Sequence, residues 1–556
     1  MRPRTGIAAF ATLMTTAGVL AAAAGATAAH ASTATAAGHD GGRPGGLGIG
    51  QTRLIPGDLL VSTSQYKNDP NIVAGTTQLP PGCTGANCVT AIANGSYPQV
   101  FNNVTVDANF GVTSPFLLKQ ITPSGLPQGV IPVPTSELNT SFSSKSEGAL
   151  NLSTDGKSVT FMGYVAAPDT VDVSNANTPA VIDPTNPVPG AYYRAVANLS
   201  SDGRFTFTET NAYSGDNGRA AIEANVDGQD IFYTTGNAGN GANPQPSGVV
   251  LGTGAQIVTP SNIPEAKQTP GQPTPVGSFS VAQLGDKADK VGKDDNFRGL
   301  AIYNNVLYYT KGSGSNGVDT VYFLDTTGTA CPDGVGLPVA GAKLPTAGIE
   351  STLTSAGLAS NMCILKGFPT ALAKDATDAS DYPFGLWFAN PTTLYVADEG
   401  AGDNTYANGS YTAAAASATA GLQKWVYSAA AGQWQLAYTL QNGLNLGAPY
   451  SVRGYPTGIN SVTGLPWAPA TDGLRNLTGQ VNRDGTVSIW AVTSTVSGGG
   501  DQGADPNQLV EITDSLKATS APAQERFRTV VPALYDQVVR GVSFTPGTGT
   551  GLLGGR

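Results

Sequence analysis

The segment Asp295-Asn296-Phe297-Arg298-Gly299-Leu300 indicates the fold class, because its pattern returns along the chain. The pattern is an Asp, two residues, an Arg, a small residue and an apolar run. Such heads recur at Asp216–Ile222 with Arg219, at Asp472–Leu477 with Arg475 and, with one extra residue, at Asp536–Val542 with Arg540. Two copies are incomplete: Asp381–Leu386 has Phe384 in place of Arg, and Glu147–Leu150 is weaker still.

The segments that come after each head also repeat. After the head at 295 come the turn Asn304-Asn305, a β-rich run at 307–309, a Gly-rich loop at 312–317 and a further run at 320–324. Turns of this kind join hairpin strands. Four short strands and long loops, recurring five or six times, predict an all-β propeller. The alternatives are a β-sandwich pair or an irregular all-β protein.

The two ends of the repeat region are complementary. The last head, at Arg540, is followed by Pro546 and a Gly-rich tail and has no hairpin partner of its own. The first β-rich run, at 58–62, has no head before it. We therefore expect these N- and C-terminal strands to pair within one blade, which would remove exposed sheet edges. Counting heads predicts six four-stranded blades; seven is the alternative, because residues 54–146 are long enough to hold another.

Short phrases in the repeats resemble those of known propellers. Leu394–Gly400 is similar to the strand phrase of NHL-type propellers, and Leu152–Lys157 and Leu199–Arg204 are similar to the Ser-x-Asp-Gly-Lys/Arg phrase of YVTN- and TolB-like propellers. The resemblance implies the architecture alone. Some propeller relatives are lactonases or lyases that rely on histidine.

Histidine is nearly absent from this chain. Its 556 residues include two, His30 and His39, and both precede the repeats. A Ser-His-Asp or Cys-His pair and a histidine-ligated metal are therefore not expected in the folded body. The chain carries 29 basic and 39 acidic residues, a net charge of −10, with no basic run. That balance argues against nucleic-acid binding.

The chain begins with features of an export signal. Arg2 and Arg4 precede an apolar stretch, and Ala29-His30-Ala31 forms a small-x-small cleavage site. We expect a signal peptide at 1–31, a flexible Gly-rich leader at 32–53, the propeller at 54–546 and a flexible tail at 547–556. The product would be secreted and extracellular, and the alanine-rich signal is typical of bacteria.

Four cysteines suit that compartment. Cys83 and Cys88 are five residues apart, and Cys331 and Cys363 are thirty-two apart. Of the three possible pairings, the local one, 83–88 and 331–363, is favoured because each bond closes a local loop. No histidine or second ligand pair accompanies the C-x4-C spacing, so no metal is predicted there.

The recurring arginines are the candidate site. The strand that opens each propeller blade lines the axis, so we expect Arg219, Arg298, Arg475 and Arg540 to converge near one channel mouth. Crowded guanidiniums need acceptors. The preceding aspartates, Asp216, Asp295, Asp472 and Asp536, can supply them. This arrangement has two interpretations: a structural ring of Arg–Asp pairs, or an incomplete ring that binds an anion such as a uronate or phosphate. Phe384 would break the ring and form an apolar wall.

Two functions remain open. The first is a secreted binding or scaffold protein that presents its loops and channel to an extracellular small molecule, glycan or protein, as a monomer and without a membrane partner after signal cleavage. The alternative is a histidine-independent hydrolase or lyase that acts on a polysaccharide or ester through carboxylates. No cofactor is predicted. A Ca²⁺ ion is the alternative at Asp398, Glu399, Asp403 and Asn404, or at Asp501 and Asp505, although neither stretch has the calcium-loop spacing.

Overall fold

A computed structural model describes residues 53–549, except 67–72, 80–81, 86–87, 92–111, 143–146, 184–185, 187, 189, 238–253, 268–276, 288–293, 347–360, 376–380, 462 and 500–501. The predicted export signal, nearly all of the leader and the end of the tail lie outside the described residues. Both histidines and Asp501 lie outside them as well.

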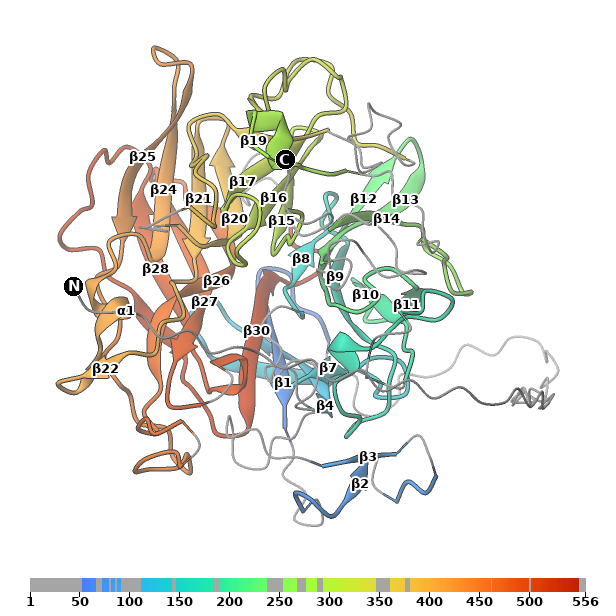
Figure 1. Ribbon diagram of the computed structural model, residues 1–556. Coiled ribbons are helices and arrows are strands. Elements are labelled where there is room, and N and C mark those ends of the chain that lie inside the picture. The colour runs from blue at the N-terminus through green and yellow to red at the C-terminus, as the bar shows by residue number, and fades with distance from the viewer. Residues whose placement is uncertain are drawn as a thin grey trace, which may run out of the picture. The chain divides into compact units, whose positions relative to one another are not determined.

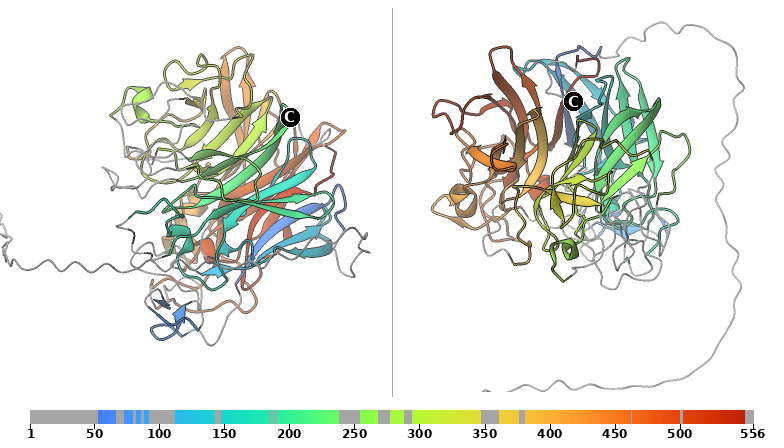
Figure 2. Two further views of the ribbon diagram at one scale, coloured as in Figure 1. Left: turned by 90° about the vertical axis from the view of Figure 1, so that its right-hand side faces the viewer. Right: turned by 90° about the horizontal axis from the view of Figure 1, so that it is seen from above.

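Six β-sheets surround a central axis (Figures 1 and 2). Their first strands contact one another in the order β30, β8, β12, β15, β20 and β26, and β26 contacts β30 again. This closed ring confirms the propeller with six blades. The described part of residues 54–146 completes blade 1 and adds two short strand pairs, β2–β3 and β4–β7, instead of a seventh blade.

Each blade runs outward from the axis in the order of its paired strands. Blade 1 holds β30 (Gln537–Phe544), β1 (Leu59–Gln65), β5 (Phe116–Ile121) and β6 (Pro127–Pro132). Blade 2 holds β8 (Asn151–Leu152), β9 (Ser158–Tyr164), β10 (Arg194–Ser200) and β11 (Phe205–Thr210). Blade 3 holds β12 (Gly218–Val226), β13 (Gln229–Gly236) and β14 (Ala255–Val258). Blade 4 holds β15 (Leu300–Tyr303), β16 (Val306–Lys311), β17 (Thr320–Leu324), β19 (Met362–Leu365) and β18 (Val335–Gly336). Blade 5 holds β20 (Pro383–Asn390), β21 (Thr393–Asp398), β24 (Gly421–Ser428) and β25 (Gln433–Leu440). Blade 6 holds β26 (Ala470–Val481), β27 (Thr486–Val496), β28 (Leu509–Ser515) and β29 (Arg528–Val531).

The remaining elements are short. The small strand pairs are β2 (Gln78–Leu79) with β3 (Val89–Thr90), β4 (Thr113–Ser114) with β7 (Thr140–Ser141), and β22 (Tyr406–Ala407) with β23 (Ser410–Tyr411). The helices are α1 (Thr412–Ala416), η1 (Val173–Asn175), η2 (Val281–Leu284) and η3 (Gln502–Ala504). No helix within the described ranges is long and apolar enough to cross a membrane.

Blade 1 is built from both ends of the propeller. Strand β1 pairs antiparallel with β30, from Leu59 opposite Phe544 to Gln65 opposite Gln537. In Figure 1, β1 lies in blue beside β30 in red. The predicted closure is therefore confirmed, and β1 has a hydrogen-bonded neighbour on each side, β30 and β5.

In three heads the glycine after the arginine position marks a close approach between blades. A Cβ on Gly299 would lie 2.1 Å from the carbonyl oxygen of Phe384, and a Cβ on Gly385 would lie 2.6 Å from that of Arg475. A Cβ on Gly541 would lie 2.5 Å from the amide nitrogen of Leu150. At these three positions neighbouring blades thus approach backbone to backbone, which explains the glycine there.

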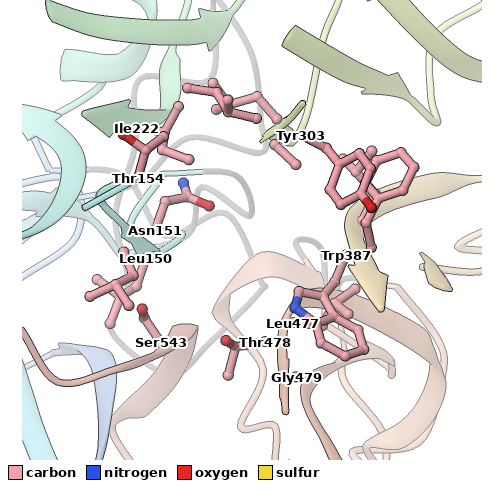
Figure 3. Close-up of a pocket in the computed structure, with 16 residues that line it drawn as sticks. Leu150, Asn151, Thr154, Ile222, Tyr303, Trp387, Leu477, Thr478, Gly479 and Ser543 are labelled. Carbon is pink, nitrogen blue, oxygen red and sulfur yellow. The ribbon is translucent and has the colours of Figure 1, made fainter. Parts of the chain in front are cut away.

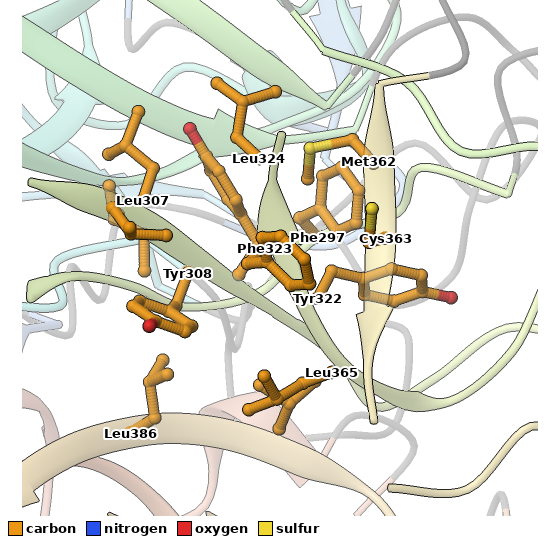
Figure 4. Close-up of a cluster of buried hydrophobic side chains, with 14 of the residues drawn as sticks. Phe297, Leu307, Tyr308, Tyr322, Phe323, Leu324, Met362, Cys363, Leu365 and Leu386 are labelled. Carbon is orange, nitrogen blue, oxygen red and sulfur yellow. The ribbon is translucent and has the colours of Figure 1, made fainter. Parts of the chain in front are cut away.

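The core lies between neighbouring blades. One buried cluster joins blades 3, 4 and 5, a second joins blades 1, 2 and 6, and a third joins blades 5 and 6. Figure 4 shows part of the first, where Tyr308 and Phe323 of blade 4 face Leu386 of blade 5. Each sheet buries its faces against its neighbours, as stacked blades require.

Both predicted disulfides are present. Cys83 is bonded to Cys88 and Cys331 to Cys363, and the described residues include no free cysteine. The second bond ties the connection after β17 to β19, the fourth strand of blade 4.

Candidate functional site

The four head arginines are buried on or just before the first strands of their blades. Three of them are electrostatic neighbours. Burial and then the charge of Arg298 lower the pKa of Arg219, and burial lowers the pKa of Arg298, with Arg475 adding to the effect. Arg219, Arg298 and Arg475 therefore share one end of the channel, which we call the arginine end.

Arg219 and Arg298 donate hydrogen bonds to the head and to a loop of blade 4. Arg219 donates from Nη1 to the carbonyl of Phe297 at 2.7 Å and to the side chain of Asn296, so it bridges blade 3 to the head of blade 4. Arg298 donates from Nη2 to the hydroxyl of Ser313, in the Gly-rich loop after β16.

Arg475 takes its acceptor from another blade. Its Nε lies 3.1 Å from Oε2 of Glu399, which follows β21 of blade 5. The prediction that each arginine pairs with the aspartate of its own head is wrong here, because Asp472 instead accepts the backbone N–H of Gly402 at 2.7 Å. Phe384 is buried, and the guanidinium of Arg475 lies over its ring, 6.0 Å from the centroid.

The other head aspartates also organise backbone. Asp295 is fully buried and accepts the N–H of Phe279 at 2.7 Å and the hydroxyl of Ser278 at 3.0 Å. Asp216 accepts the N–H of Asn217 at 2.9 Å and the side-chain amide of Asn237.

The last head differs from the other three. Arg540 donates from Nη2 to the carbonyls of Ser141 and Phe142, in the segment before blade 2. The aspartate of this head is Asp536, and burial raises the pKa of its carboxyl to about 6. Arg540 thus joins blade 1 to that segment.

A polar cavity of about 380 Å³ opens at the arginine end. Its charged lining residues are Arg475, Glu399, Asp319 and Asp472. Gly-rich loops after β16 and β21 form its rim, and Tyr382, Ser315, Ser494 and Thr495 add polar groups. This volume lies within the range of ligand pockets, about 300–1,000 Å³.

The carboxylates of the cavity are compensated. Asp319 forms a 2.5 Å ion pair with the buried Lys311, yet burial raises its pKa. Next to the cavity, burial raises the pKa of Asp398 to about 8, although this carboxyl accepts the N–H groups of Tyr382 and Gly400. The cavity therefore holds the pairs Arg475–Glu399 and Lys311–Asp319, and burial favours the protonated form of Asp319 relative to an exposed aspartate.

The described carboxylates considered as calcium ligands form hydrogen bonds or an ion pair with groups of the protein. Asp398 accepts backbone N–H groups, Glu399 pairs with Arg475, and Asp403 accepts the N–H of Thr405 at 2.7 Å. Asp505 accepts hydroxyls from Tyr455 and Ser497. No group of three or more His, Cys, Asp or Glu side chains in the described part of the chain is placed to hold a metal ion.

The other end of the channel, where the hairpin turns lie, has a different character; we call it the turn end. Side chains from all six first strands or their flanks surround a smaller cavity of about 80 Å³. Figure 3 shows Asn151, Thr154, Thr478, Trp387 and Tyr303 around this opening. None of the described residues that line it is charged, so charge is concentrated at the arginine end.

Sequence reasoning missed several residues of the arginine end. Arg194 of β10 is fully buried, donates to the carbonyls of Asp216 and Ala176, and lies over the ring of Tyr164. Lys311 and Asp319 were missed as well, although both flank a Gly-rich loop that is evident in the sequence.

No protein-family model and no curated protein matches the chain. Three solved structures illustrate the distant resemblances found. One is an acylaminoacyl peptidase in complex with Z-Gly-Gly-Phe-chloromethyl ketone, at 7% identity over 76% of this chain and 43% of that one, with a TM-score of 0.27. Another is a polysaccharide lyase, an ulvan lyase bound to -[GlcA(1-4)Rha3S]-, at 10% identity over 81% and 97%, with a TM-score of 0.29. The third is the parainfluenza virus 5 hemagglutinin-neuraminidase with DANA, at 11% identity over 78% and 84%, with a TM-score of 0.25. Scores this low carry no argument about function, and the strand order alone establishes the propeller.

Proposed function

We propose that the protein is a secreted binding propeller that takes an acidic sugar unit of an extracellular glycan into the cavity at the arginine end. The observation that carries the proposal is the state of the Arg475 side chain. Its Nε is held by Glu399, while its two terminal nitrogens form no hydrogen bond within the described residues. A guanidinium fixed in this way offers a planar pair of donors that matches a carboxylate.

The surroundings of Arg475 suit the rest of a sugar. Asp319, Asp472 and the hydroxyls of Ser315 and Thr495 line the same cavity and can accept or donate hydrogen bonds to sugar hydroxyls. Glu399 and Asp319 are already paired with Arg475 and Lys311. Because Arg298 and Arg219 lie close by, an incoming carboxylate would meet further guanidiniums beside Arg475.

Secretion is the part of the proposal that rests on the sequence. The charged, apolar and small-x-small features of residues 1–31 favour export, and two disulfide bonds suit an oxidising compartment. Mass spectrometry of protein recovered from culture medium, with a mature chain beginning at Ser32, would test this step.

Calorimetric titration with oligogalacturonate and with a neutral oligosaccharide of equal length tests the ligand. Removing Arg475 alone would take its counter-charge away from the buried Glu399, so the variant is the double change Arg475→Gln with Glu399→Gln. The matched control is Arg528→Gln with Glu511→Gln, an ion pair whose arginine is half exposed on β29.

We expect the oligogalacturonate to bind the wild type, to bind the cavity variant at least tenfold more weakly, and to bind the control unchanged. Equal binding of the acidic and neutral sugars, or undiminished binding by the folded cavity variant, would contradict the proposal.

A second candidate function is hydrolysis or elimination through carboxylates in the same cavity. The observation that favours it is Asp319, a carboxyl of raised pKa that shares the cavity with Glu399. Turnover of polyuronates or chromogenic glycosides by the wild type, lost in Asp319→Asn while binding persists, would establish the enzyme. Binding without turnover would contradict the enzyme and support the binding propeller.

A further inference from the structure

A second cavity, of about 500 Å³, lies at the turn end between blades 4 and 5. It is bounded by the turn Asn304-Asn305, by residues 337–342 and by Tyr427 and Trp434 of blade 5. Strand β15 runs from Leu300, two residues after Arg298, to Tyr303 beside this turn. The groove is therefore separate from the arginine-end cavity and lies at the other end of the strands.

Aromatic rings form the floor of the groove. Tyr303 stacks on Phe388 with centroids 4.4 Å apart and planes 16° apart. Phe388 also contacts Tyr308 at 4.7 Å and the edge of Trp434 at 6.0 Å, and Trp434 in turn contacts Tyr427 at 5.8 Å. Four of these five side chains are buried, Tyr427 being the exception, so their positions are fixed by packing before any ligand arrives.

The groove has hydroxyls and amides but no charge. None of the described residues that line it is acidic or basic. The hydroxyls of Tyr308 and Tyr427 form no hydrogen bond within the part of the chain that the structure describes, and the exposed Asn304 and Asn305 stand at the rim. Such a surface offers the partly exposed ring of Tyr427 to C–H groups and unused polar groups to hydroxyls.

We infer that this groove binds an uncharged oligosaccharide, with a sugar ring against the partly exposed Tyr427 and sugar hydroxyls at Tyr308 and the two asparagines. A charged ligand would enter without a counter-charge, and a purely apolar one would leave the tyrosine hydroxyls without partners. The inference is independent of the proposed function, because it concerns another end of the channel and a neutral ligand.

The groove continues toward the axis. Tyr303 and Phe388 line both the groove and the central opening of Figure 3, whose lining also includes the half-buried Trp387 and Thr478. A chain of several sugar units, longer than the groove alone would hold, would therefore find further aromatic and hydroxyl contacts at the channel opening.

The test is titration of the full-length protein with cellohexaose, xylohexaose and mannohexaose, followed by saturation-transfer NMR. Tyr427→Ala removes a rim ring, and Tyr308→Phe removes one hydroxyl while its ring stays in the floor. Tyr193→Phe, directly before β10 of blade 2, is the matched control. Thermal melting establishes that each variant is folded.

We expect at least one of these hexasaccharides to bind, with Tyr427→Ala weakening it at least tenfold, Tyr308→Phe several-fold and Tyr193→Phe not at all. The Arg475→Gln/Glu399→Gln variant should bind it as the wild type does, which separates this site from the arginine-end cavity. Failure of all three sugars to bind, or binding that is insensitive to both groove variants, would overturn the inference. Binding of decaproline in their place, lost in Tyr427→Ala, would overturn it in favour of a proline-rich peptide.

Discussion

The guanidinium of Arg475 lies over the ring of Phe384, the residue that occupies the arginine position in the preceding blade. The exception in the repeat therefore supports the arginine whose terminal nitrogens are available to a ligand. An arginine at 384 would put a second buried guanidinium beside Arg475, without its own acceptor.

This relationship predicts that restoring the repeat is harmful. Phe384→Arg should lower the free energy of unfolding by about 3 kcal/mol or more, because it buries an unpaired charge next to a like charge. Phe384→Leu, which keeps an apolar side chain, should lower it by about 1–2 kcal/mol. Urea denaturation measures both. A Phe384→Arg protein as stable as the wild type would show that stability does not require an apolar side chain at position 384.

The glycine of the blade 4 head should not tolerate a methyl group. Gly299→Ala would place its Cβ 2.1 Å from the carbonyl oxygen of Phe384, so the first strands of blades 4 and 5 would have to separate. We expect a loss of about 2–3 kcal/mol in unfolding free energy. Gly549→Ala is the control, since a Cβ there meets nothing within 4 Å. Similar stability of the two variants would contradict the close approach.

Closure of blade 1 predicts different effects for two truncations. Removal of residues 540–556 deletes most of β30 and should prevent cooperative folding, because β1 would lose its partner. Removal of 547–556 leaves β30 whole and deletes the Thr548 hydroxyl that accepts from Gly57, for a loss of about 1 kcal/mol. Circular dichroism during thermal unfolding compares them, and equal tolerance of both cuts would refute closure.

The Cys331–Cys363 bond should matter more than Cys83–Cys88. Replacing both cysteines of a pair by serine frees a loop of 32 residues in one case and of 5 in the other. In the chain-entropy description, the expected losses are about 3–4 and about 2 kcal/mol. Guanidinium denaturation of the two double variants measures both losses of unfolding free energy. A larger loss for the Cys83–Cys88 variant would contradict this prediction.

Asp505 should make stability depend on pH. Burial raises the pKa of this carboxyl to about 7 in the folded chain, above its value near 4 in the unfolded chain. The folded protein therefore holds a proton that the unfolded chain has released, so stability should fall as pH rises from about 4 to about 7, by up to about 4 kcal/mol. Asp505→Asn should flatten this slope in denaturation at several pH values; an unchanged slope would contradict the assignment.

The sequence predicted the features that local pattern determines. In blade 4 the runs at 307–309 and 320–324 coincide with β16 and β17, because alternating turns and β-rich residues specify hairpins. It could not identify Glu399 as the partner of Arg475, since the two are 76 residues apart and meet only when blades stack. The parallel strand β18 was also missed, because it forms within a long connection that has no head.

The pairing of β1 with β30 has a consequence for how the chain is made. Residues 59–65 leave the ribosome early, whereas the strand that covers their inner edge ends at Phe544. Until then the edge of β1 can join other chains, and the ring of blades can stack but not close. Because the chain is made from its N-terminus, the ring of blades stays open until nearly the whole chain has been synthesised. A chaperone that shields β1 during that interval would protect the nascent chain from aggregation.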